Sequence, residues 1–326
     1  MGSFRAFAAA ITLMCVLAPG QAPAADASWP KSVVIATASP GGSYYLFGQA
    51  LSAMLSQSIG VEVVAQPTQG PLQNIVLLEE RQAALGMITS GIGLQAWNGA
   101  EWTKGQQYRS MRVIFPMYDT QFHIAAPKKG GIATIADLNG KRLGIGPRGG
   151  TGGTYVPAIF RLLGVSAVLR NSSFEDIATQ ILLTDDLDGI VVLTGAPLPA
   201  LMDIEQHAAM NYIGLSPQQI ERVRKDLPEM TDAKIPARAY PSLAQDYPTV
   251  GLYNFTVAHK DLPDDLIYRI VKAVFEGHDA LVKAHPAARE TVAANINRNT
   301  LFPVHPGAVR YYREIGIAVS DQIPIN

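Results

Sequence analysis

The sequence predicts an α/β protein with two lobes, and three observations support this. Strands and helices alternate near the N-terminus, a second alternation follows from about residue 142, and long strands at residues 112–126 and 249–258 lie between and after the two sets. Alternating strands and helices favour parallel β-α-β winding. A chain of 326 residues, 48% hydrophobic and 16% charged, is long enough to form two well-packed lobes.

The first lobe is predicted from hydrophobic periodicity. Residues 32–37 form a short run of β-branched and apolar side chains, which is typical of a buried strand. The apolar residues that follow recur at helical spacing, so a helix begins at Ser43 or Tyr44. The same patterns predict further strands over residues 61–66 and 84–89 and a helix over residues 71–80.

The rest of the chain is predicted to form the second lobe and to return to the first. Residues 228–248 are rich in proline, alanine and charge, which predicts an irregular linker. We assign residues 28–119 and 256–326 to lobe I and residues 120–255 to lobe II, joined by two crossings. The remaining elements are strands over 112–117, 122–126, 142–145, 188–193 and 250–258, a turn-helix over 136–140, and helices over 154–163, 262–284, 286–296 and 306–315.

The N-terminus has the order of a secretory signal peptide. Arg5 supplies a positive charge, an apolar run extends from Ala6 to Ala18, and A-x-A cleavage patterns follow, so we expect cleavage near Ala25. About 13 apolar residues reach about 20 Å, which is too short for the roughly 30 Å core of a membrane. Cys15 is the only cysteine and leaves with this segment, so the mature chain has no disulfide. We expect a soluble periplasmic protein.

Loops that follow predicted strands carry the candidate binding residues. Ligands of open parallel sheets bind at the carboxyl ends of the strands, where glycines admit the ligand and helix N-termini attract anions. Lobe I offers residues 37–43, 68–70 and 89–90, with Asn74 in the first turn of a helix. Lobe II offers residues 147–154 and 194–195, where the glycine-rich loop is either an anion-binding nest or a flexible hinge.

Other classes of site are not supported by the sequence. The glycine-rich loop lacks the lysine of a phosphate-binding loop, and no G-x-G-x-x-G, G-x-S-x-G or H-E-x-x-H motif occurs, so we expect neither a cofactor nor an enzyme. The six histidines have no metal-ligand spacing, and we interpret them as solvated or helix-capping residues. Asp185, Asp186 and Asp188 are interpreted as a solvated turn. The net charge of −1 and the lack of a basic stripe exclude nucleic acid as a partner.

Five segments give the chain a resemblance to a known family. They are ATASPGGSYYLFG at 36–48, Gln73-Asn74, ADLNGKRLGIG at 136–146, TGAPLPAL at 194–201 and PVHPGAVRYYREIG at 303–316. In these the chain resembles the TAXI family of solute receptors of TRAP transporters. The resemblance implies a type II-like periplasmic-binding-protein fold, a ligand related to glutamate or an oxo-acid, and a sodium-driven membrane permease as partner. It also implies ligand contacts from Ser39, Gly42, Ser43, Tyr44, Thr68, Asn74 and Ser90.

The second wall of the expected cleft is assigned to Arg148, Gly150, Thr151, Thr194 and Gly195. Arg148 is the only cation in the proposed binding loops, and it either contacts the ligand, guards the rim, pairs across the lobes or is solvated. The neutral residues at Gln73 and Gly91 favour a dicarboxylate or oxo-acid over a zwitterionic amino acid. A receptor for an ATP-driven transporter, a sensor, and a periplasmic enzyme on the same scaffold remain the alternatives. We expect a monomer that closes on its ligand by a hinge motion.

Overall fold

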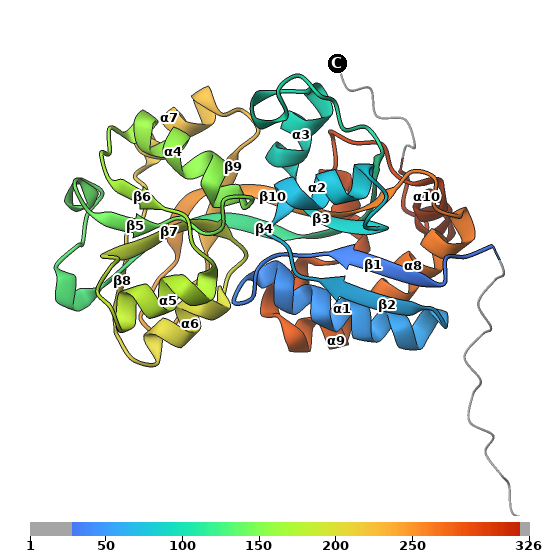
Figure 1. The fold of residues 1–326 in the computed structure, drawn as a ribbon, viewed down its shortest axis with the longest axis horizontal. Helices are drawn as coiled ribbons and strands as arrows, with labels where there is room; N and C mark the ends of the chain where they lie inside the picture. The colour runs from blue at the N-terminus through green and yellow to red at the C-terminus, as the bar shows by residue number, and fades with distance from the viewer. Residues whose placement is uncertain (1–27, 320–326) are drawn as a thin grey trace, which may run out of the picture.

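The structure is a computed structural model that describes residues 28–319, and it has a two-lobed α/β fold (Figure 1). This confirms the predicted fold class. The predicted signal peptide lies outside the described residues. Within the described part of the chain, no helix is both long enough and apolar enough to cross a membrane.

Lobe I contains both ends of the described chain. Its N-terminal half alternates strand and helix, and the C-terminal helices then pack beside α1. Figure 1 shows the blue N-terminal and red C-terminal elements together in one half of the molecule. The elements are β1 (Ser32–Ala36), α1 (Ser43–Ile59), β2 (Glu62–Gln66), α2 (Pro71–Glu79), β3 (Leu85–Thr89), α3 (Ser90–Asn98), η1 (Glu101–Thr103), α8 (Asp264–Glu276), α9 (His278–Ala284), η4 (Pro286–Glu290), η5 (Ala293–Arg298) and α10 (Pro306–Glu314).

Lobe II is formed by the middle of the chain, drawn in green and yellow (Figure 1). It repeats the alternation of strand and helix and adds short strands near the crossing strands. Its elements are η2 (Lys128–Gly130), η3 (Ala136–Leu138), β5 (Arg142–Gly144), α4 (Thr151–Leu163), β6 (Val168–Arg170), α5 (Phe174–Leu182), β7 (Gly189–Thr194), α6 (Pro199–Glu205), β8 (Met210–Tyr212), α7 (Pro217–Asp226) and β9 (Thr231–Ile235).

Two long strands join the lobes. β4 (Met111–Pro127) and β10 (Tyr247–His259) pair antiparallel at the centre of a sheet ordered β2-β1-β3-β10-β4-β7-β5-β6. The strands beyond this pair are parallel within each lobe, β1 with β2 and β3, and β5 with β6 and β7. The predicted lobe boundaries, 119/120 and 255/256, fall inside these two strands and stay a prediction.

The largest part of the hydrophobic core surrounds the crossing strands. Phe115, Tyr118 and Phe255 are completely or almost completely buried there. A smaller cluster under α5 and α6 includes Ile177 and Leu201. Because the crossing strands carry the main core, they form a stiff base from which the loops of both lobes project.

The structure corrects several sequence-based boundaries. The strands predicted over 112–117 and 122–126 are one strand, because Asp119 to Gln121 continue the pairing with β10. The predicted linker contains β9, which pairs with β10 although its own side chains are mostly exposed. Residues 286–296 form two short 3₁₀ segments instead of a continuous helix, and α4 begins at Thr151 instead of 154.

Candidate functional site

A small cavity lies between the two lobes, with a volume of about 40 Å³. Both walls come from loops at the carboxyl ends of parallel strands, where open α/β sheets bind their ligands. Among the described residues, no charged side chain lines it. The lining is Ala38, Gly42, Ser43, Tyr44, Gln69, Gly70 and Pro71 from lobe I, Thr120 from the crossing strand β4, and Ile145, Gly146, Pro147, Gly150, Thr151, Gly152, Phe174, Val192, Leu193, Thr194 and Gly195 from lobe II.

The N-termini of α1 and α4 face this cavity from opposite lobes. Gly42 precedes α1 and Gly150 precedes α4, both with an extended backbone, and no side chain caps either helix. By contrast, the serine hydroxyls of Ser173 and Ser216 cap α5 and α7. The first N–H groups of α1 and α4 have no partner within their own helices, so they are available to an acceptor in the cavity.

The two walls are in direct contact, so the structure represents a closed form. The Ser43 hydroxyl donates to the Gly195 carbonyl at 2.8 Å and lies 3.1 Å from the Thr194 hydroxyl. The backbone also bridges the lobes, with the N–H of Leu72 donating to the carbonyl of Gly149 at 3.2 Å. These bonds hold the two walls of the cleft together.

A buried asparagine on β10 organises one side of the cavity. The Asn254 Oδ1 accepts hydrogen bonds from the hydroxyls of Tyr44, at 2.6 Å, and Thr120, at 2.8 Å. Its Nδ2 donates to the carbonyl of Tyr118 at 2.6 Å. Burial, and then the neighbouring Tyr118, raise the pKa of Tyr44 well above its ordinary value, so this phenol stays protonated. Asn254 was not predicted, because nothing in its sequence context distinguishes it from other strand residues.

Seven of the twelve predicted site residues line the cavity, and the other five do not. Thr68 and Asn74 instead support the wall: the Thr68 hydroxyl donates to the Asn74 Oδ1 at 2.6 Å, and the Asn74 amide donates to backbone carbonyls. Ser39 is buried without a hydrogen-bond partner for its hydroxyl, and Ser90 is buried at the start of α3. Arg148 is exposed beside the cavity loop. The seven lining residues are Gly42, Ser43, Tyr44, Gly150, Thr151, Thr194 and Gly195.

Several lining residues were missed by sequence reasoning. Thr120 lies in the middle of β4, where the alternation of a strand gives no sign of a cleft. Phe174 begins α5, and its ring approaches Gly42 so closely that a side chain there would meet it at 3.0 Å. A glycine opposite an aromatic residue is visible only after folding, so no local signal predicts this contact.

The histidine interpretation is correct in part. His285 and His305 cap the segments that follow them, each accepting from a backbone N–H two residues later. The solvated reading is wrong for His123 and His259 as well as for these two, because all four are buried. Asp188 pairs with Arg142, at 2.8 Å, instead of lying in a solvated turn. Within residues 28–319 no cluster of three or more His, Cys, Asp or Glu residues is suited to a metal ion.

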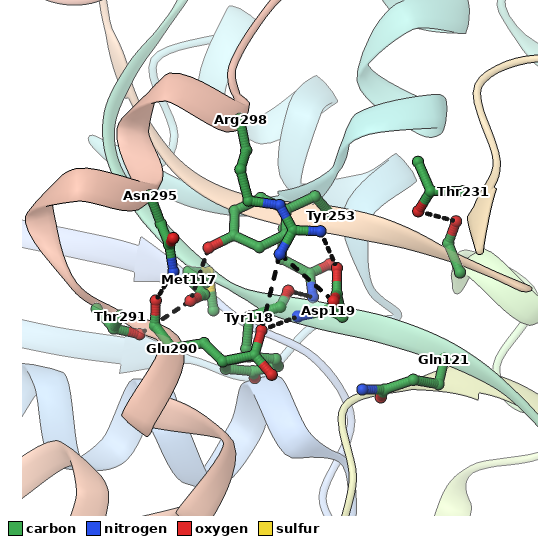
Figure 2. A network of polar contacts seen from close by, with 12 residues as sticks. Met117, Tyr118, Asp119, Gln121, Thr231, Tyr253, Glu290, Thr291, Asn295 and Arg298 are labelled. Carbon is green, nitrogen blue, oxygen red and sulfur yellow. Dashed lines mark hydrogen bonds and ion pairs between the residues drawn. The ribbon is translucent and has the colours of Figure 1, made fainter. Parts of the chain in front are cut away.

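A network of polar contacts braces the crossing strands beside the cleft (Figure 2). Arg298 of η5 pairs with Asp119 of β4 at 2.7 Å and lies over the Tyr253 ring of β10, 3.8 Å from its centre. Glu290 accepts from the backbone N–H of Asp119 at 3.2 Å. Burial raises the pKa of Asp119, and Arg298 opposes that rise. The C-terminal segment therefore holds both crossing strands next to the cavity.

Comparison with known proteins gives the fold a context. Residues 35–316 match the NMT1-like family. MatC from Rhodopseudomonas palustris with bound malate shares the fold, with a TM-score of 0.58 and 12% identity over 83% of this chain and 95% of MatC. The periplasmic binding protein BugD has a TM-score of 0.55 and 14% identity over 89% and 99% of the two chains. A third structure, described as a periplasmic transporter, has a TM-score of 0.51 and 16% identity over 87% and 92%.

Proposed function

Because the chain belongs to the NMT1-like family, we propose that it is a solute receptor that binds a small carboxylate between its lobes. The observation that carries the proposal is the meeting of two uncapped helix N-termini at one cavity without a charged lining residue. Unpaired N–H groups and the helix dipole favour a negative charge there. Neutral hydroxyls and an apolar remainder add hydrogen bonds and packing without repelling an anion.

We further propose that the receptor works in the periplasm with a membrane transporter. The fold it shares with BugD is that of a periplasmic binding protein, and the N-terminal residues have the pattern of an export signal. The resemblance to the TAXI family favours a sodium-driven TRAP permease, and a receptor for an ATP-driven transporter is the alternative. Uptake into vesicles that contain the cognate permease distinguishes them: a sodium gradient should drive uptake, whereas dependence on ATP would favour the alternative.

Binding of the carboxylate is tested by calorimetry with acids and their amides. Monocarboxylic and dicarboxylic acids of three to five carbons, including 2-oxoglutarate and glutamate, are compared with the neutral amide of each acid that binds. The acid should bind at least tenfold more tightly, because only the anion gains from the helix ends. An amide that binds as tightly as its acid would contradict the proposal.

Two variants at one position separate the backbone from the side chain. Ser43 is the first residue of α1, where proline fits the helix but has no N–H. The preceding Gly42 is extended, as a residue before proline prefers. Ser43→Pro should therefore weaken acid binding about tenfold more than Ser43→Ala, which removes only the hydroxyl. Equal effects of the two variants would show that the α1 N–H group does not bind the carboxylate.

A further inference from the structure

The hydrogen-bonding capacity of the cavity wall restricts the ligand further, given the proposed function. A hydroxyl group has one proton to donate and two lone pairs that accept. Once the proton is committed to a protein acceptor, the hydroxyl can only accept from a ligand. The partners of Tyr44 and Thr120, the two hydroxyl residues of the wall that bond to β10, therefore determine what this wall recognises.

The orientation of the Asn254 amide follows from its third contact. One end of the amide lies 2.6 Å from the carbonyl oxygen of Tyr118, which has no proton to give, so this end must be the NH₂ group. The other end is then the oxygen, and it faces the hydroxyls of Tyr44 and Thr120. Both hydroxyls must donate to it, so neither proton remains for a ligand.

This arrangement does not depend on closure of the cleft. Tyr44 belongs to α1 of lobe I, while Thr120 and Asn254 belong to the paired strands β4 and β10. No residue of the separate loops of lobe II takes part in these bonds. The contacts of Ser43 with Thr194 and Gly195 differ, because they join the two lobes and break when the lobes separate.

The cavity therefore has donors at its helix ends and acceptors at the Tyr44–Thr120 wall. A carboxylate matches the donors, and a hydroxyl or an ammonium group matches the acceptors. Since no charged side chain among the described residues lines the cavity, nothing there compensates a buried ammonium ion. A carbonyl oxygen would place its lone pairs against those of the two hydroxyls.

We infer that the ligand is a hydroxycarboxylate whose hydroxyl donates to the Tyr44–Thr120 wall. The carboxylate lies at the N-termini of α1 and α4, as in the proposed function. An oxo-acid is disfavoured because its carbonyl oxygen would face the hydroxyl oxygens of the wall, which can only accept. The acid without a hydroxyl is disfavoured because it leaves those oxygens without a donor. This inference differs from the dicarboxylate or oxo-acid that the sequence favours, and matched ligands can distinguish the two.

Matched ligand sets test this inference by calorimetry on the mature protein. Each set holds chain length constant: lactate, pyruvate, alanine and propionate; 3-hydroxybutyrate, acetoacetate and butyrate; and 2-hydroxyglutarate, 2-oxoglutarate, glutamate and glutarate. In the set that binds, the hydroxy acid should have at least tenfold higher affinity than every other member. If an oxo, amino or unsubstituted acid binds as tightly as its hydroxy counterpart, the inference is overturned while the carboxylate proposal stands. If no acid binds, the proposed function itself fails.

Variants of the wall test whether its two hydroxyls recognise the hydroxyl of the ligand. Tyr44→Phe and Thr120→Val remove the two hydroxyls with little change in volume. At least one of them should reduce the preference for the hydroxy acid over the unsubstituted acid by fivefold or more. Tyr45→Phe and Thr256→Val are the matched controls, because neither residue lines the cavity. An unchanged preference in both folded wall variants, or an equal loss in the controls, would overturn the assignment.

Discussion

At the scale of single residues, glycines allow the two walls of the cleft to come into contact. Gly70 has φ 119° and ψ −161°, a conformation that is almost restricted to glycine. A Cβ added to it would lie 3.0 Å from the Gly149 oxygen and from the Gly150 Cα, both in the opposite wall. The two walls therefore approach each other as backbone, and a side chain at this position would hold them apart.

Gly70→Ala should weaken ligand binding and destabilise the protein. The backbone strain is about 1–3 kcal/mol, and the added methyl group opposes closure, which the ligand requires. Thermal unfolding and calorimetry measure the two effects. Gly130→Ala is the control, because a Cβ there meets no atom within 4 Å. Unchanged affinity in Gly70→Ala would mean that the ligand-bound cleft is wider than the structure shows.

The same scale shows how far a sequence can define this site. The glycine and hydroxyl residues after β1, β5 and β7 were predictable, because loops at the carboxyl ends of parallel strands form the binding edge. Thr68 and Asn74 have equally suitable side chains, yet the structure commits their polar atoms to each other and to the backbone. The residue type shows which hydrogen bonds a side chain can form. Which partner it bonds to depends on the residues that surround it in the folded protein.

At the scale of elements, the crossing strands and the C-terminal 3₁₀ segments form one unit. Arg298 contacts β4 through Asp119 and β10 through the ring of Tyr253 (Figure 2). Asp119 is mostly buried, which raises its pKa, and Arg298 favours its charged form. The paired strands thus have a brace where the two lobes meet.

Arg298→Gln should lower the free energy of unfolding by about 1–2 kcal/mol. The glutamine keeps a hydrogen-bonding group but leaves a partly buried carboxylate without its cation. Urea unfolding measures the change. Arg289→Gln, an exposed arginine of the neighbouring segment η4, is the matched control and should have little effect. Equal stabilities of the two variants would show that the ion pair does not brace the strands.

Some helices and strands could be predicted from the local sequence pattern, and others could not. The β1–α1–β2–α2–β3 succession was predicted within a few residues, because buried parallel strands and amphipathic helices have strong periodicity. β4 was divided in two, because Asp119 and Thr120 interrupt its apolar run, although β10 pairs with the strand on both sides. β9 was read as a linker, since a mostly exposed strand at the edge of a sheet has no apolar signature.

At the scale of the whole molecule, buried histidines link stability to pH. Burial lowers the pKa of His123, His285 and His305 to about 4 each, and also lowers that of His259. Below the ordinary value of about 6.5 the unfolded chain therefore binds protons that the folded protein does not. The stabilisation is complete above pH 6.5 and is lost as the pH falls toward 4. The raised pKa values of Asp119 and Glu290 oppose this loss.

We expect the protein to be less stable at pH 5 than at pH 7.5. One fully buried histidine such as His123 contributes about 2 kcal/mol to the difference. Urea unfolding at the two pH values measures it. His123→Asn should reduce the difference even though it lowers stability at both pH values, whereas replacement of the exposed His207 should leave it unchanged. Stability that rises on acidification would mean that the carboxyl groups dominate.

The closed cleft makes a prediction about the shape of the molecule in solution. The cavity of about 40 Å³ has room for roughly three water molecules, and hydrogen bonds join the two lobes beside it. A carboxylic acid of three or more carbons must therefore enter an open form, with the paired strands β4 and β10 as the connection about which the lobes turn. Small-angle scattering of the ligand-free protein should give a larger radius of gyration than this structure, and saturation with a binding acid should decrease it.

Ser43→Ala, which removes the bond to Gly195 between the lobes, should shift the ligand-free protein further toward the open form. If the radius is the same with and without ligand and in the variant, the lobes do not move as a hinge.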